Sequence, residues 1–319
     1  MKKVLKIIGI ILAVLIAAIV VVFVIASKRP MIAEDYYDHI ETGGEIEAKY
    51  TAMGTYEVKS KEYKAEGQRW KNYTVWYPAE LESASGKYPL VVMANGTGVQ
   101  NYKYTPVFKH LASWGFIVVG NDDDSSATGD STELSLQLML NENDDPGSIF
   151  FRRIDTDNIG VTGHSQGGVA VIHALYATEH SDLYKSGFAL SATTEHLIDE
   201  LNLETFRYDI SKVNVPLVMV AGTLPGDAES ISPLADMQTN FENATVPTMI
   251  ARRTGADHGD VLTWADGYMT AWFRYMLMDD EEAAKAFVGD TAEIMGNPNW
   301  QDQQSKGFTY IKMPPFTGK

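Results

Sequence analysis

A strand-to-helix turn built around one serine constrains the fold of this chain more than any other feature. Residues 163–167 are Gly-His-Ser-Gln-Gly, with a short apolar run before them and a helical pattern of apolar residues at 169–178 after them. This context is typical of a nucleophile elbow, in which a tight turn exposes a serine hydroxyl, and a side chain at either glycine would clash there. The pattern predicts that Ser165 is a nucleophile at a helix N-terminus; a glycine-rich turn with an incidental serine is the alternative.

Apolar runs and helical patterns alternate along most of the chain. Period-two alternation at 48–58 and 73–77 predicts two antiparallel strands at a sheet edge. Buried strands are expected at 88–93, 116–119, 159–162, 187–190, 216–221 and 248–252, and helices at 104–114, 131–140, 169–178 and 260–278. This order predicts an α/β fold with a doubly wound, mostly parallel sheet, whose ligands bind at the carboxyl ends of the strands.

The charge of the chain is unevenly distributed. The net charge is −16, and the five basic residues before position 34 are the only charges there; without them, 26 − 5 = 21 basic residues face 42 acidic ones, so the remainder carries −21. An acidic body argues against nucleic-acid binding. Cysteine is absent, which excludes disulfides and thiolate metal sites.

The N-terminus predicts a membrane segment. Residues 7–26 are 20 uncharged, almost wholly apolar residues, which as a helix span about 30 Å, the thickness of the hydrocarbon core of a bilayer. We expect one N-terminal transmembrane helix with an extracellular catalytic domain, located at the cell membrane. The alternative is a signal sequence cleaved near residue 26, which would yield a secreted protein.

Three segments follow from these patterns. Residues 1–27 are expected to form the anchor or signal, and residues 28–47 a stalk or linker with at most a short helix, which Gly43 and Gly44 would break. Residues 48–319 are expected to form one catalytic domain.

A nucleophilic serine needs a base, and the base needs an acid to orient it. In this fold class the order is serine, acid, histidine. His258 follows the last expected strand and is the predicted general base, whereas His196 is expected at a helix start or pocket rim. His164 is expected to point into the packing under the elbow, and His173 and His180 to lie on the elbow helix.

The acid is expected after the strand at 216–221. Asp227 is the predicted residue and Glu229 the runner-up, although either could instead cap the next helix. Asp257 adjoins His258 in sequence and cannot easily reach the far side of its ring, and Asp260 is expected to cap the closing helix.

An oxyanion hole needs two backbone N–H donors. One is expected from Gln166, directly after the serine, and the second from the loop at 94–98, where Thr97 is the predicted donor. An ordinary glycine turn is the alternative interpretation of that loop.

No cofactor and no metal are predicted. Residues 122–124 are three aspartates and Asp130 follows, but the spacing lacks the ligand pattern of a calcium loop, so a solvated loop at the pocket edge is expected. The chain has no phosphate-binding or dinucleotide-binding glycine motif.

These motifs resemble the α/β-hydrolase superfamily, and within it the bacterial polyester hydrolase (cutinase-like), chlorophyllase and dienelactone-hydrolase-related group. The resemblance rests on residues 88–98, 111–116, 155–168, the Asp227 loop, and the His258 loop with residues 271–273. It implies an α/β-hydrolase fold and ester hydrolysis through an acyl-enzyme, with Ser165, Asp227 and His258 as the triad and Thr97 as the second oxyanion donor.

The expected activity is a serine ester hydrolase acting on a small-molecule or lipid-like ester. Polyester-degrading members often carry an aromatic residue at the position of Thr97 and a tryptophan around 191–194, where this chain has threonine and a small polar run. The alternatives are an acyltransferase or peptidase on the same triad, and a catalytically silent binding ectodomain. Residues 194–213 are long enough for a small lid.

Overall fold

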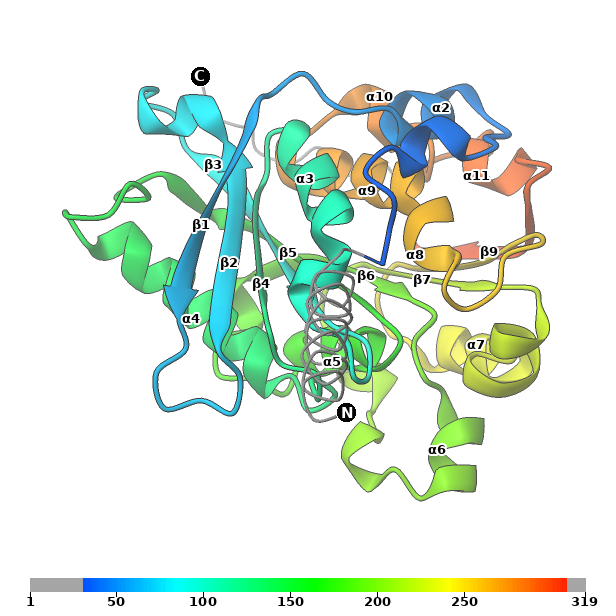
Figure 1. Cartoon of the computed structure of the whole chain (residues 1–319). Helices are drawn as coiled ribbons and strands as arrows, with labels where there is room; N and C mark the ends of the chain where they lie inside the picture. The colour runs from blue at the N-terminus through cyan, green and yellow to red at the C-terminus, as the bar shows by residue number, and fades with distance from the viewer. Residues whose placement is uncertain (1–30, 309–319) are drawn as a thin grey trace, which may run out of the picture.

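The computed structural model describes residues 31–308, and the statements that follow concern this part of the chain. One nine-stranded sheet runs through it, in the order β1-β2-β4-β3-β5-β6-β7-β8-β9 (Figure 1). Strands β4, β3, β5, β6, β7 and β8 are parallel neighbours, while β1, β2 and β9 pair antiparallel at the two edges. The strands are β1 (Val58–Lys64), β2 (Asn72–Pro78), β3 (Tyr88–Ala94), β4 (Ile117–Asn121), β5 (Ile154–His164), β6 (Tyr184–Leu190), β7 (Leu217–Gly222), β8 (Thr248–Arg253) and β9 (Trp300–Lys306).

Helices cover both faces of the sheet (Figure 1). Helices α2, α3 and α9 pack on one face and α4, α5 and α7 on the other. The helices are α2 (Glu45–Thr51), α3 (Thr105–Ser113), α4 (Asp130–Asp144), α5 (Gln166–Ala174), α6 (Glu195–Leu201), α7 (Leu234–Asn243), α8 (Val261–Trp264), α9 (Asp266–Met278), α10 (Glu281–Ala284) and α11 (Glu293–Gly296). The mixed α/β fold with a mostly parallel sheet is therefore confirmed.

Strand β3 shows why the apolar runs predict buried strands. Every residue of β3 is buried. Leu90 and Val92 contact the layer of α4 and α5, while Val91 and Met93 contact the layer of α3 and α9. A strand covered on both faces has no polar side, so its sequence is continuously apolar.

The strand order reverses at β3. This strand lies between β4 and β5, so the chain passes from one side of β3 to the other between successive strands. A crevice opens outside the carboxyl ends of strands at such a reversal. The loop after β3 and the turn after β5 both lie at this crevice, which places residues 94–98 beside Ser165.

The N-terminal part of the described chain differs from the expectation. A strand was predicted at 48–58, but residues 45–51 form helix α2, and the edge strand is β1. The carboxylate of Glu293 accepts hydrogen bonds from the N–H groups of Ile46 and Glu47, each 2.8 Å long, and so caps α2. The indole of Trp300 donates to Glu47. These partners lie far along the sequence, and they override the local alternation.

The expected stalk is also partly folded. Tyr36 lies in a short 3-10 helix (Tyr36–His39) and is buried, and Glu47 is 1 % exposed. The expected boundary between residues 47 and 48 thus falls inside α2. The predicted anchor at 7–26 lies outside the described residues. Within residues 31–308, no helix has the length and apolar character needed to cross a bilayer.

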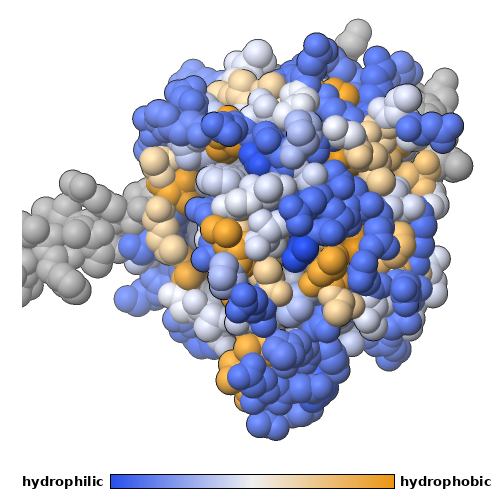
Figure 2. Space-filling view, turned by 90° about the vertical axis from the view of Figure 1, so that its right-hand side faces the viewer, coloured by the Kyte–Doolittle hydropathy of each residue, from blue (hydrophilic) through white to orange (hydrophobic). Residues whose placement is uncertain are grey.

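Two further elements differ. The closing helix predicted at 260–278 is divided into α8 and α9, with Ala265 between them, and β9 was not predicted. The segment expected as a lid contains α6, which projects from the body at the bottom of Figure 1. Figure 2 shows a mainly hydrophilic face with small, separate apolar patches, as the acidic composition leads us to expect.

Candidate active site

Ser165 lies in a strained turn between β5 and α5. Its backbone has φ 62° and ψ −123°, which is uncommon for a residue other than glycine. A Cβ at Gly163 would lie 2.3 Å from the carbonyl oxygen of Gly167, and a Cβ at Gly167 would lie 2.3 Å from that of Ala94. The predicted clash at both glycines is confirmed. The N–H of Ser165 donates to the carbonyl of Leu190 at 2.9 Å, which ties the turn to β6.

The loops after β7 and β8 bring Asp227 and His258 together. Asp227 lies at the start of a short π-helix (Gly226–Ile231) after β7 and is fully buried. His258 Nδ1 donates to Asp227 Oδ1 at 2.7 Å. Glu229, the runner-up, is exposed. The N–H groups of Thr223 and Leu224 both donate to the carbonyl of Ala256 at 3.0 Å, which fixes one loop against the other.

Two further donors keep the Asp227 carboxylate charged. Asp227 Oδ2 accepts hydrogen bonds from Ser191 Oγ and from the N–H of Gly222, each 2.6 Å long. Burial by itself raises the pKa of Asp227, but the hydrogen bonds from His258, Ser191 and Gly222 outweigh it, so the pKa lies below its ordinary value. Ser191 follows β6 with φ 44° and is fully buried, so its hydroxyl is held toward the acid.

His164 connects the His258 loop to the elbow. His164 Nε2 donates to the carbonyl of His258 at 2.8 Å, and the two rings lie 4.5 Å apart between centroids. His258 therefore lies against the residue that precedes Ser165. The expectation that His164 points into the packing is correct for its burial, but it missed this contact with the base.

The tautomer of His164 follows from its partners. A carbonyl only accepts, so Nε2 carries the proton, and Nδ1 is free to accept from the Tyr104 hydroxyl at 3.4 Å. Burial and the neighbouring His258 lower the pKa of His164 to about 4, which keeps the ring neutral near pH 7. The Tyr104 hydroxyl also accepts from the N–H of Gly96 at 3.3 Å. One chain of hydrogen bonds thus links the loop after β3 to the His258 loop.

The two expected oxyanion donors lie on segments held by one carbonyl. The carbonyl of Asp124 accepts from the N–H of Gly98 and from Gln166 Nε2, both at 2.9 Å. Thr97 is exposed, and its N–H has no acceptor among the described residues. Gln166 opens α5, where a backbone N–H has no acceptor within the helix. Both N–H groups are thus free for a ligand.

The aspartate run at 122–124 packs against the loop at 94–98, which contains Thr97. Asn95 Nδ2 donates to the carbonyls of Asn121 and Asp123, at 2.6 and 2.8 Å. Asp123 is 1 % exposed and binds Arg69 with an N–O distance of 2.6 Å. The loop was expected to be solvated, but its middle residue, Asp123, is buried and paired with Arg69.

The other histidines lie apart from Ser165. His196 is exposed in the first turn of α6, as expected for a helix start. His173 lies on α5 as predicted, and its ring contacts the carbonyls of Ala127 and Arg207. His180 was also placed on that helix, but α5 ends at Ala174, so His180 lies beyond it.

Comparison with known proteins shows which group this chain is similar to. A family model described as "Chlorophyllase" matches residues 48–190, a span that includes Thr97, Ser165 and Gln166. Two cutinases of Thermobifida fusca, "Cutinase cut1" and "Cutinase" of strain YX, are each 25 % identical over 244 residues, which cover 74 % of this chain and 67 % of the relative. The chain resembles the cutinase- and chlorophyllase-like group of the α/β-hydrolase superfamily. The expected resemblance is confirmed. In α/β-hydrolases a serine turn, an acid loop and a histidine loop lie at one edge of the sheet.

Sequence reasoning missed three residues of this site: His164, Ser191 and Asp124. Only His164 left a signal, because a histidine beside the expected nucleophile is a titratable group at the crevice. Asp124 acts through a backbone carbonyl, which any residue supplies, and Ser191 acts through a hydroxyl that no local pattern marks. Their roles depend on the loops that face them.

Proposed function

We propose that this protein is a serine carboxylic ester hydrolase that acts through an acyl-enzyme on Ser165. The observation that carries the proposal is the pair Asp227–His258, hydrogen-bonded at 2.7 Å and held by His164 against the strained serine turn. At the level of the family, the resemblance to cutinases and chlorophyllases supports ester hydrolysis.

The hydrogen bonds define the role of each ring nitrogen. His258 Nδ1 faces a carboxylate that can only accept, so Nδ1 carries the proton of the neutral ring and Nε2 is the free base. In the proposed mechanism Nε2 removes the proton of Ser165, whose Oγ attacks the ester carbonyl. Asp227 stabilises the imidazolium that forms. His258 then protonates the leaving alcohol and activates a water that releases the acid.

The developing negative charge needs donors already in place. The N–H groups of Gln166 and Thr97 are proposed to bind the oxyanion, since neither has an acceptor within residues 31–308 and the Asp124 carbonyl fixes their segments relative to each other. The exposure of Thr97 makes the site open to solvent on this side. The proposed substrates are small-molecule or lipid-like esters.

A covalent probe tests the proposal. The full-length protein in detergent is treated with a fluorophosphonate, beside Ser165→Ala, His258→Ala and the surface control His196→Ala. We expect labelling of the parent and the control, hydrolysis of p-nitrophenyl acyl esters but not of amides, and loss of kcat by about 10³-fold or more in both active-site variants.

Other outcomes would point elsewhere. Transfer of the acyl group to an added alcohol in preference to water would favour an acyltransferase, and cleavage of amides a peptidase. An unlabelled parent would contradict the proposal and favour a binding ectodomain. Labelling that survives in Ser165→Ala would also contradict it, because the reacting nucleophile would then be another residue.

We also propose that residues 7–26 anchor the enzyme in the cell membrane with the catalytic domain outside. The support is the length and the uncharged, apolar character of this segment. Membrane fractionation, followed by protease treatment of intact cells and mass determination of the product, tests it. A soluble product shortened by about the first 26 residues would instead indicate a cleaved signal and secretion.

A further inference from the structure

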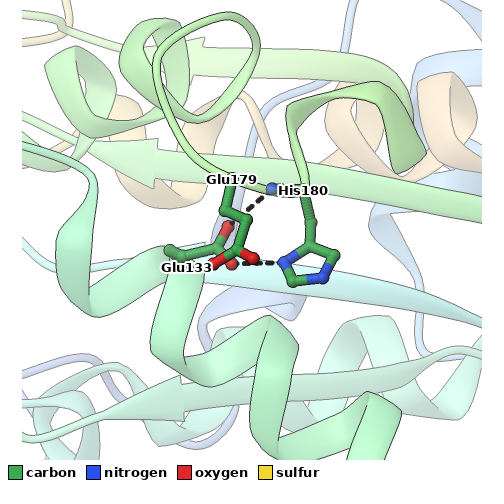
Figure 3. A group of neighbouring side chains, drawn as sticks. All are labelled: Glu133, Glu179 and His180. Carbon is green, nitrogen blue, oxygen red and sulfur yellow. Dashed lines mark hydrogen bonds and ion pairs between the residues drawn. The ribbon is translucent and has the colours of Figure 1, made fainter.

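Three potential metal ligands converge away from the proposed active site. Glu133 lies in the first turn of α4, and Glu179 and His180 lie in the connection that follows α5. Their ligand atoms all lie within 4.8 Å of one another, and Figure 3 shows the three side chains directed toward a common point. Glu133 and His180 are 47 positions apart, so no sequence motif joins them, and the expectation of no metal cluster could not take them into account.

Glu133 is held in place before any ligand arrives. Its carboxylate accepts hydrogen bonds from His180 Nδ1 at 2.5 Å, from Gln137 Nε2 at 2.8 Å and from the N–H of His180 at 3.3 Å. Its side chain is 10 % exposed. A ligand oriented by surrounding donors loses little freedom when a metal binds, which favours binding.

The cluster carries more negative charge than its neighbours compensate. Among residues 31–308, neither Glu133 nor Glu179 forms an ion pair with a lysine or arginine, and the contact between Glu133 and His180 Nδ1 is the one close pair within the cluster. Two neighbouring carboxylates without a lysine or arginine attract a cation.

A second observation comes from Tyr184, at the start of β6. Its hydroxyl is buried and has no hydrogen-bond partner among the described residues. Tyr184 follows His180 by four positions in the chain, so an unpaired polar group lies on the segment that carries two of the three ligands.

We propose that Glu133, Glu179 and His180 form a binding site for a divalent transition-metal ion of the Zn²⁺ class. One imidazole nitrogen and two carboxylate oxygens suit Zn²⁺, whereas Ca²⁺ and Mg²⁺ prefer oxygen ligands alone. Three protein ligands leave a position for water. The ion would connect α4 to the segment that leads into β6 and would take no part in the chemistry of Ser165.

A metal ion competes with protons for these ligands, because an imidazole nitrogen and a carboxylate oxygen bind a metal only in their deprotonated forms. The contact between His180 Nδ1 and Glu133 must give way to the metal. Affinity should therefore fall as the pH decreases.

The test uses the full-length, tag-free protein in detergent and Zn²⁺ as the probe. Calorimetric titration in two buffers of different ionisation enthalpy is expected to show one high-affinity equivalent and net proton release. The thermal unfolding midpoint is expected to rise by about 2–5 °C at saturating Zn²⁺. Glu179→Gln changes an exposed side chain and His180→Asn a half-buried one, and each is expected to weaken binding by at least about tenfold.

His196 and Glu200 provide the matched control. This surface histidine lies 3.9 Å from its carboxylate and has no third ligand, so His196→Asn should leave Zn²⁺ affinity and proton release unchanged. Parent-like affinity in both Glu179→Gln and His180→Asn would overturn the proposal, as would a loss of affinity in His196→Asn. Preferential binding of Ca²⁺ over Zn²⁺ would also contradict it.

Discussion

Two histidine–aspartate pairs in this protein have nearly the same geometry and different surroundings. His258 Nδ1 lies 2.7 Å from Asp227, and His110 Nδ1 lies 2.8 Å from Asp266. Each aspartate also accepts a hydrogen bond from a hydroxyl, from Ser191 in the first pair and from Tyr36 in the second. The pair by itself therefore does not distinguish a catalyst from a structural contact.

The two pairs differ in the surroundings of Nε2, the ring nitrogen that faces away from the aspartate. His110 is fully buried, and its Nε2 lies 3.0 Å from the carbonyls of Thr51 and Ala52. The side chain of His258 is 24 % exposed, and its Nε2 has no hydrogen-bond partner among the described residues. The ring of His110 joins the end of α2, at Thr51 and Ala52, to Asp266 at the start of α9. The ring of His258 keeps one nitrogen without a partner at the crevice.

The charge of the two rings follows from the same contacts. Both nitrogens of His110 face acceptors, an arrangement that favours the doubly protonated ring. Burial lowers the pKa of His110, but Asp266 and then the carbonyls of Ala52 and Thr51 outweigh it, and the pKa lies above its ordinary value. A ring whose two nitrogens both face acceptors has no free nitrogen to act as a base, which suits a structural role.

The largest expected effect separates the two aspartates. Asp227→Asn should lower kcat by about 10³- to 10⁴-fold with the fold intact, because the ring of His258 loses its orientation and its counter-charge. Asp266→Asn should keep kcat per folded molecule within about threefold, but lower the free energy of unfolding by about 3–5 kcal/mol, since it breaks a buried pair. Ester turnover and urea unfolding measure the two effects. A large loss of kcat in folded Asp266→Asn would invalidate the comparison.

A smaller effect concerns the pH dependence of stability. His110→Gln should lower the free energy of unfolding by about 3 kcal/mol near pH 6. The raised folded-state pKa of His110 means that its contribution is full below the unfolded value of about 6.5 and is lost as the pH rises through the folded-state value. Urea unfolding of parent and variant from pH 5 to 9 should show the two converging at high pH. A difference that grows with pH would show that His110 is neutral.

The smallest expected effect separates the two hydroxyls. Ser191→Ala should lower kcat by about tenfold with little change in KM, because Asp227 loses one of its donors at a cost of about 1–2 kcal/mol. Tyr36→Phe should leave kcat unchanged and lower the free energy of unfolding by a similar amount. Ser191→Gly removes the hydroxyl without the positive-φ strain and should lower kcat like Ser191→Ala. Recovery of kcat in the glycine variant would assign the effect to the backbone instead.

Much of the fold was predictable because its signals are local. The buried strands β3 to β8 and the helices between them appear as apolar runs and periodic patterns, and the chain order of strand ends led to Asp227 and His258 as candidates. The pairing of His110 with Asp266 was not predictable, since neither residue has a local pattern and 156 positions separate them (266 − 110). Helix α2 was mistaken for a strand because its cap, Glu293, lies at the other end of the domain.

The sequence alone determined which residue types could do chemistry and at which ends of which strands they lie. A turn with glycines at 163 and 167 is a local steric requirement, and a continuous apolar run is a local statement about burial. The tertiary structure decided that His258 keeps one ring nitrogen without a partner, whereas both ring nitrogens of His110 face acceptors. It also decided that His164 donates a hydrogen bond to the His258 loop and that Glu133, Glu179 and His180 lie close together. The physical reason is that proton affinity and access depend on every group within a few ångströms, and the chain brings those groups together only by folding.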